Sequence, residues 1–138
     1  MSEQEKGPTR GSQIIDGYGD DNSFDRLQSW NDYLQANAGK KIDDAFIADI
    51  WRVLDTAGNL LIRKHHDYGP KNIAHSPGGA LNGLRVRMWD KVARINNLLD
   101  SNLSPSNESL RDSFLDLLNY SAIAIMVLDK KWPELPND

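Results

Sequence analysis

Apolar residues recur every three or four positions along the longer segments of this chain, and this period constrains the fold more than any other feature. In segment 42–66 the apolar positions are Phe46, Ile50, Leu54, Ala57 and Leu61. In segment 80–101 they are Leu84, Met88, Val92, Ile95 and Leu99. Such spacing lines one face of an α-helix, and no segment alternates as a half-buried strand does. The sequence therefore predicts an all-α protein.

Two further segments show the helical period. A shorter N-terminal helix follows Ser23 as a possible N-cap and stops near Gly39. A last helix runs to about Lys130; its N-cap is Ser104, with Pro105 at the first helical position, or one of Ser106 and Asn107, and Glu108 falls in its first turn. We expect a helical bundle of three long helices plus this shorter one.

Composition narrows the class of protein. The 138 residues fit one domain, which we place at 22–138, after a polar segment 1–21 that we expect to be a flexible tail. The net charge of −4 makes nucleic acid an unlikely partner. The N-terminus lacks the pattern of a signal peptide, and the longest nearly charge-free stretch, 117–128, is too short to cross a bilayer. These features predict a cytoplasmic protein without a membrane partner.

Charged side chains flank the apolar face of the last two long helices. Arg87, Lys91 and Arg94 form one ridge, and Asp112, Asp116 and Asn119 share a face of the last helix. Since that helix is apolar nearly all round from 117 to 128, we expect it to be buried, with Asp116 and Asn119 entering the bundle. Antiparallel packing brings the two groups together. They form either salt bridges between helices or a pocket whose cations hold phosphate.

The long connection 67–83 is rich in glycine and proline, which is often a sign of a functional loop. Gly69 and Pro70 forbid continuation of the helix before it. Around this point the stretch "KHHDYGPKN" carries the candidate ligand-binding residues Tyr68, Lys71 and Asn72, along with Lys64, His65, His66 and Asp67. Tyr68 either stacks on a base or covers the core. Adjacent histidines on a helix point about 100° apart, so they favour C-terminal capping over a shared metal.

The string "KHHDYG … RVRMWDKVARINNLL … ESLRDSFLDLLNYSAIAIMVL" resembles a phage-associated family, the nucleotide-modification-associated domain 1. Its "DYG" turn, "DK-x-x-R" helix and "D-x-x-x-D" helix succeed one another here over about residues 60–129. The resemblance implies an all-α protein that handles nucleotides, in the cytoplasm of the host cell if a phage encodes it.

The chain is also distantly similar to the all-α nucleoside triphosphate pyrophosphohydrolases of MazG type. Their "E-E-x-x-E" and "E-x-x-D" helices hold Mg²⁺, but only Asp90 and Asp116 keep a carboxylate here, while Lys91 and Arg94 replace acids of the motif. Cations at these positions repel Mg²⁺ and strengthen direct binding of phosphate. That family commonly assembles into dimers or tetramers, which implies a homo-oligomer.

Our hypothesis is a nucleotide-binding protein that sequesters a nucleotide without a cofactor, with Lys91, Arg94 and Lys71 as anion contacts. In it Asp112, Asp116 and Asn119 orient those cations or contact polar groups of the ligand, and Arg87 belongs to the same set of ligand-binding residues. The alternative is a Mg²⁺-dependent nucleoside phosphate hydrolase or nucleotide-modification enzyme in which Asp112 and Asp116 hold the metal. A third interpretation is a structural helical protein with a salt-bridge network.

Overall fold

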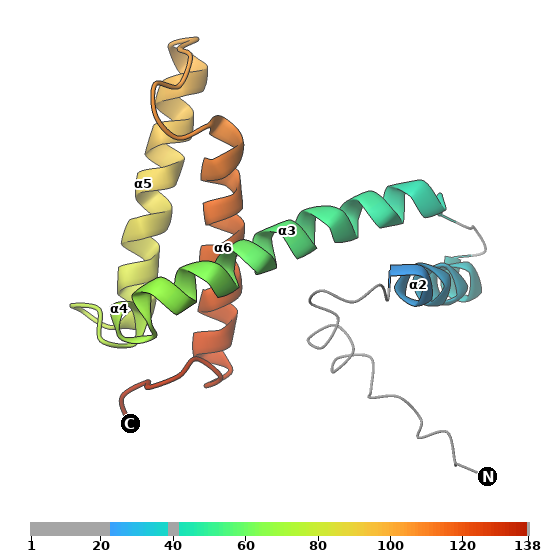
Figure 1. The fold of residues 1–138 in the computed structure, drawn as a ribbon, viewed down its shortest axis with the longest axis horizontal. Helices are drawn as coiled ribbons and strands as arrows, with labels where there is room; N and C mark the ends of the chain where they lie inside the picture. Colours follow the sequence, from blue (N-terminus) through green and yellow to red (C-terminus); the bar gives the residue numbers. More distant parts are fainter. Residues whose placement is uncertain (1–22, 39–41, 138) are drawn as a thin grey trace. The chain divides into compact units, whose positions relative to one another are not determined.

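The computed structural model describes residues 23–38 and 42–137, which form helices α2, α3, α4, α5 and α6 and contain no strand (Figure 1). The all-α prediction is confirmed. The predicted tail 1–21 and Gly39 lie outside the described residues. The chain divides into two compact units, Met1–Asn59 and Leu60–Asp138, and each is described by itself.

The first unit holds α2 (Ser23–Ala38) and the greater part of α3 (Asp44–Tyr68). The amide of Asn31, which is 2 % exposed, donates a hydrogen bond to the carboxylate of Asp44 and so ties the two helices. The apolar stripe predicted for α3 is only partly buried. Ala57 is buried, but three other members are more than a third exposed, namely Phe46, Ile50 and Leu54.

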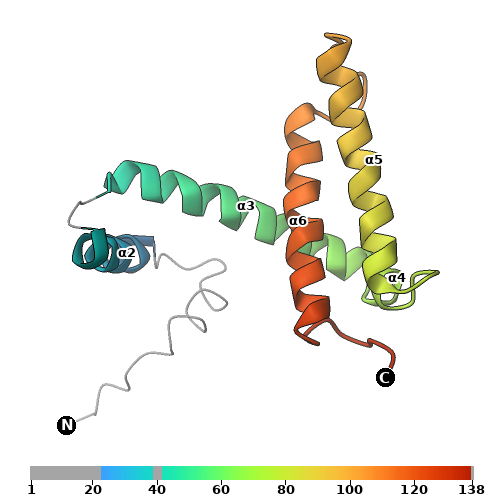
Figure 2. The same cartoon turned by 180° about the vertical axis from the view of Figure 1, so that it is seen from behind.

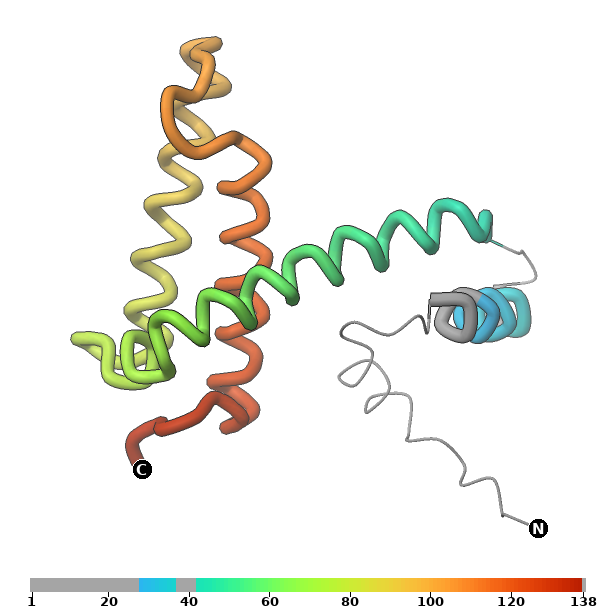
Figure 3. The backbone as a smooth tube through the Cα atoms, viewed as in Figure 1, coloured from blue at the N-terminus to red at the C-terminus, as the bar shows by residue number. Residues whose placement is uncertain are grey.

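The second unit is an antiparallel pair of long helices; the last turns of α3 pass beside the middle of α6, and a short helix lies at the end of the pair where α5 begins (Figures 1 and 2). The pair consists of α5 (Ala80–Asp100) and α6 (Leu110–Leu128), joined by the connection 101–109. The smoothed trace in Figure 3 follows the chain up α5, over this connection and down α6. The predicted antiparallel packing of the last two helices is confirmed.

The end of α3 differs from its predicted boundary because the helix continues to Tyr68. Gly69 then takes a left-handed conformation with φ +66°, and its N–H donates to the carbonyl oxygen of His65 at 2.8 Å. This is a common way to end a helix, since glycine adopts positive φ without steric cost. After Pro70 the predicted irregular loop contains an unexpected short helix, α4 (Lys71–Ala74).

The start of α6 corrects the sequence analysis. The N-cap is Ser109, not Ser104, Ser106 or Asn107. Its hydroxyl accepts the N–H of Asp112 at 3.0 Å, and its own N–H donates to the Asp112 carboxylate at 3.1 Å. This reciprocal capping box satisfies two N–H groups that a helix start otherwise leaves free. Glu108 therefore precedes the helix instead of lying in its first turn.

The core of the second unit gathers where α4, α5, α6 and the C-terminal segment meet. It consists of Ile73, Ala74, Leu84, Ile123 and Trp132. Ile95, predicted for the core stripe of α5, is also buried, but Leu99 is 58 % exposed. The prediction that α6 is buried all round is wrong, because Ile125 and Leu128 are exposed. The buried face of α6 is the one that carries Asp116 and Asn119.

Candidate functional site

A cavity of about 290 Å³ lies within the second unit, beside its core. This volume is near the lower end of the roughly 300–1,000 Å³ typical of small-molecule pockets. The last turns of α3 and the start of α4 form one side, α5 and α6 form another, and the C-terminal segment closes the end. The lining residues that carry polar or aromatic groups are Lys64, His65, Tyr68, Asn72, Arg87, Asp116, Asn119, Tyr120 and Trp132.

The floor of the cavity holds Asp116, which is 6 % exposed. Its Oδ1 lies 2.7 Å from Nζ of Lys64, and its Oδ2 lies 2.7 Å from Nζ of Lys91. Lys91 also lies 2.7 Å from Oε2 of Glu108, which completes a chain of two cations and two carboxylates. Because positive and negative side chains alternate in this network, it carries no net charge when all four groups are ionised.

Electrostatics within the network keep both central groups charged at neutral pH. Burial raises the pKa of Asp116, but the hydrogen bonds from Lys64 and Lys91 outweigh it and leave that pKa below 3.8. Burial likewise lowers the pKa of Lys91, while the hydrogen bonds to Asp116 and Glu108 outweigh this effect and leave the pKa above 10.5. Asp116 is therefore a carboxylate that only accepts hydrogen bonds.

Two buried polar atoms beside the cavity have no hydrogen-bond partner within the described chain. One is Nδ2 of Asn119, a residue that is 6 % exposed, and the other is Nδ1 of His65. Both residues line the cavity. A buried polar group without a partner costs about 1–3 kcal/mol, so these two atoms point to a ligand with polar groups of its own.

Arg87 supplies the positive charge of the cavity wall. Its Nη2 donates to the carbonyl oxygen of Asn72 at 2.9 Å, and its Nη1 donates to Oγ of Ser76 at 3.3 Å. Both acceptors are neutral, and no carboxylate forms a salt bridge with Arg87 among the side chains of residues 28–36 and 42–137. Close packing of α5 on the residues that follow α4 supports this position: a Cβ on Gly83 would lie 2.5 Å from Cβ and Oγ of Ser76.

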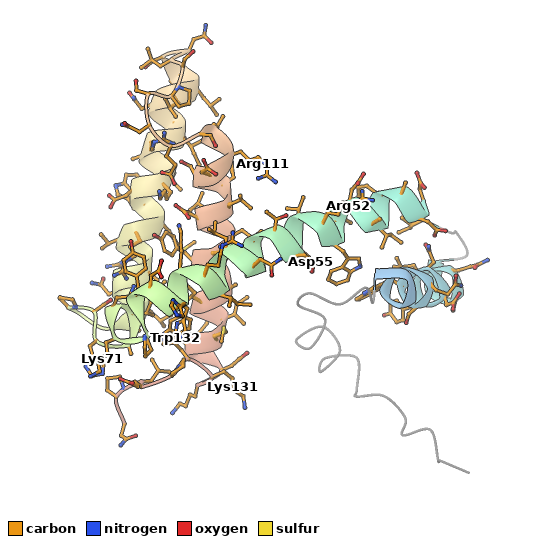
Figure 4. All side chains as sticks on the ribbon, viewed as in Figure 1. Arg52, Asp55, Lys71, Arg111, Lys131 and Trp132 are labelled. Carbon is orange, nitrogen blue, oxygen red and sulfur yellow. The ribbon has the colours of Figure 1, made fainter. Side chains whose placement is uncertain are left out.

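Aromatic rings frame the cavity at two places. Tyr68, the last residue of α3, is 69 % exposed at the mouth and does not cover the core. Trp132 is 7 % exposed and lies at the closed end, where its Nε1 donates to the carbonyl oxygen of Pro70 at 3.0 Å. Its ring meets that of His65 edge to face, with 5.0 Å between centroids. Figure 4 labels Trp132 on the C-terminal segment, near the end of α3.

The structure brings together only part of the predicted set of ligand-binding residues. Five of them line the cavity, namely Tyr68, Asn72, Arg87, Asp116 and Asn119. Four do not, namely Lys71, Lys91, Arg94 and Asp112. We expected Lys91 and Arg94 to be the central anion contacts, so their positions are the largest difference from the sequence analysis.

Lys91 and Arg94 act between the helices. Lys91 does not line the cavity but contacts the Asp116 carboxylate, and 19 % of its side chain is exposed. Arg94 donates from Nη1 to Oγ of the fully buried Ser113 at 2.5 Å and from Nη2 to the carbonyl oxygen of Glu108. The Lys91–Asp116 salt bridge joins α5 to α6, as the salt-bridge interpretation of this ridge predicted, whereas Arg94 holds the two helices together through neutral oxygens.

Lys71 and Asp112 have partners elsewhere. The Lys71 side chain is 72 % exposed, and its Nζ lies 3.8 Å from Oε2 of Glu134 in the C-terminal segment (Figure 4). Asp112 completes the capping box of α6, and the hydrogen bonds from the side chain and backbone of Ser109 lower its pKa. Neither side chain is therefore oriented as a ligand contact of this cavity.

The donor set does not fit the magnesium site of the enzyme hypothesis. Asp112 is held by Ser109, and both oxygens of Asp116 already face ammonium groups. In the described ranges no three His, Cys, Asp or Glu residues cluster as metal ligands do. We therefore derive no step through a metal ion at this site.

Four polar or aromatic cavity residues were not among the predicted ligand-binding residues. Lys64 and His65 lie in the last turns of α3, and the packing of this end of α3 within the second unit places them at the cavity. Tyr120 directly follows Asn119 on α6 and was assigned no role. Trp132 stands after the last predicted helix, where no periodic signal exists.

The second unit is therefore an all-α domain with a cavity lined by polar and aromatic side chains. Residues 64–128 match the model of the family described as nucleotide modification associated domain 1. This segment is just under half of the chain, and the match confirms the resemblance found in the sequence. It contains every cavity residue except Leu61 and Trp132. No curated protein and no solved structure matches the chain.

The phage association and the similarity to MazG-type proteins stay predictions. Within the described ranges, none of the helices combines the length and apolar character needed to cross a membrane.

Proposed function

We propose that the second unit binds a nucleotide in this cavity, with Arg87 holding a phosphate group and Tyr68 stacking on the ligand at the mouth. Arg87 carries the proposal. Its guanidinium has five N–H donors and two recorded hydrogen bonds, both to neutral oxygens. A planar guanidinium binds phosphate oxygens in a bidentate manner, and here no carboxylate in the described chain competes for it.

The family supports the same class of ligand. Its description refers to nucleotide modification, and Arg87, Tyr68 and Asn72 all fall within the matched residues 64–128. The exposed ring of Tyr68 offers an aromatic surface at the mouth, against which the part of the ligand outside the floor can pack. We propose binding without turnover, as in sequestration, because the donor set does not fit a magnesium centre. A homo-oligomer remains an expectation.

Calorimetric titration of the full chain with a panel of nucleoside mono-, di- and triphosphates tests this proposal. Each titration is run once in EDTA and once in Mg²⁺, and each mixture is then assayed for changed nucleotide, phosphate and pyrophosphate. We expect binding of equal strength in both conditions and no product. Release of phosphate or pyrophosphate in Mg²⁺ would favour the hydrolase alternative, and a modified nucleotide would favour a modification enzyme.

A pair of variants on α5 links the binding to the site. Arg87→Gln removes the guanidinium from the cavity, and we expect the affinity for the bound nucleotide to fall about tenfold or more. Arg85→Gln is the matched control, because Arg85 is exposed, donates to Asn82 and does not line the cavity. The proposal is wrong if no nucleotide binds, or if both variants bind as the wild type does.

A further inference from the structure

We infer that the ligand enters base first, so that the hydrogen-bonding edge of its base meets Asn119 and Asp116 at the floor while its phosphate stays at the wall beside Arg87. This inference rests on the proposed nucleotide binding and adds the orientation of the ligand and the residues that recognise its base. It depends on a gradient of burial and a gradient of charge across one cavity.

Burial separates the floor from the mouth. Asp116 and Asn119 are each 6 % exposed, whereas Tyr68 is 69 % exposed and Asn72 is also exposed. A phosphate group is strongly hydrated, and moving it to a buried site requires full compensation of its charge. A planar base loses less on burial, because its faces are apolar and only its edge needs partners.

The distribution of charge also favours the base at the floor and the phosphate at the wall. At the floor, the negative charge of Asp116 is already balanced within its network of ion pairs with Lys64, Lys91 and Glu108. A phosphate there would meet the Asp116 carboxylate directly. Arg87 on the wall has only neutral acceptors, so a phosphate beside it gains a charge-assisted contact without disturbing an existing ion pair.

The floor also has the hydrogen-bonding groups that a base edge requires. Nδ2 of Asn119 is a buried donor without a partner, and the Asp116 carboxylate, one helical turn earlier on α6, is an acceptor. The Watson–Crick edge of a base presents an acceptor beside a donor, for example the keto oxygen and ring N–H of uracil or guanine. Such an edge satisfies the orphaned Asn119 amide and donates to Asp116 at the same time.

The test compares fragments of one ligand on the full-length wild-type chain. The probes are the 5′-monophosphate that binds best, the corresponding nucleoside, and ribose 5-phosphate. Base-first binding predicts that the nucleoside competes for the site, and that ribose 5-phosphate alone binds at least tenfold more weakly than the monophosphate. Binding of ribose 5-phosphate without binding of the nucleoside would overturn the inference and leave nucleotide binding intact. No binding by any nucleotide would overturn both.

Methylated nucleosides locate the recognised edge. We expect methylation on the Watson–Crick edge, as in 3-methyluridine or 1-methylguanosine, to weaken binding about tenfold or more, because it removes the donor that faces Asp116. The same nucleoside methylated on its ribose 2′-oxygen is the matched control for size. Equal binding of the two methylated forms would overturn the proposed orientation.

Two variants test which residue contacts the base and which contacts the phosphate. Asn119→Leu keeps a similar volume and is expected to weaken nucleoside and monophosphate equally, while Arg87→Gln weakens only the monophosphate. The wild-type fragment comparison decides the question if Asn119→Leu fails to fold. An Arg87→Gln variant that weakens the nucleoside as much as the monophosphate would place Arg87 at the base and refute the inference.

Discussion

Removal of the Asp116 charge is the sharpest test of how the second unit is held together. Asp116→Asn keeps the side-chain shape but turns one acceptor of the buried network into a donor that faces an ammonium group. A hydrogen bond between charged groups contributes about 1.5–3 kcal/mol. The bond from Lys64 counts for less, because 45 % of that side chain is exposed and solvent screens it. Lys91 is 19 % exposed and keeps Glu108 as its remaining partner.

Together these contributions give an expected loss of about 2–3 kcal/mol in the free energy of unfolding. For a chain of this size the melting temperature should fall by roughly 8–12 °C. Urea denaturation followed by circular dichroism measures the free energy. Asp112→Asn is the matched control, since it is the same substitution one turn earlier on α6 at a carboxylate outside the network, and we expect a clearly smaller loss.

The pH dependence gives an independent check on the same carboxylate. Since the pKa of Asp116 in the folded protein lies below 3.8, its contribution to stability is complete above that value and is lost as the pH falls through the folded-state pKa. The gap between wild type and Asp116→Asn should therefore close as the pH drops from 5 toward 2. A gap that stays constant over this range, or that equals the gap for Asp112→Asn, would refute the reasoning.

Two further substitutions test the local packing and the helix start. Gly83→Ala places a Cβ 2.5 Å from two atoms of Ser76, and we expect a net loss of about 1 kcal/mol, because overpacking of about 1–3 kcal/mol exceeds the helix-propensity gain of alanine. The double variant Ser76→Gly with Gly83→Ala should recover part of that loss in thermal denaturation, and a Gly83→Ala protein as stable as the wild type would contradict the close approach. Ser109→Ala should cost about 1 kcal/mol in the same assay through loss of the N-cap, whereas Ser104→Ala, at the position that the sequence favoured, should have no effect. Equal losses in the last two variants would show that Ser109 is not the functional cap.

The helices were predictable because their signal is periodic and local. The apolar spacing in α5 and the Gly69–Pro70 stop depend only on neighbouring residues, and both agree with the structure. The start of α6 was not predictable in the same way. Several serines in 101–109 can serve as an N-cap, and only the capping box with Asp112 selects Ser109.

Site residues were predictable only where the apolar pattern of a single helix shows which of its faces is buried. Asp116 and Asn119 were expected to be buried, since their face of α6 continues into apolar residues, and they are. The partner of Asp116 depends on how far the helices slide along one another, which periodicity does not determine. Lys64 lies within the segment that was expected to be helical, and the packing of α3 beside α6 brings it to that carboxylate. The same register directs Arg94 to Ser113.

The C-terminal segment has a practical consequence for work on this domain. A fragment cut to residues 64–128 would remove Leu61 from one wall and Trp132 from the closed end, and with Trp132 the indole bond to Pro70. Such a fragment would also lose Trp132 from the buried core that it forms with Ile73 and Ile123. Expression clones intended for ligand screening should therefore retain the chain through the last described residue, and affinity tags belong at the other terminus.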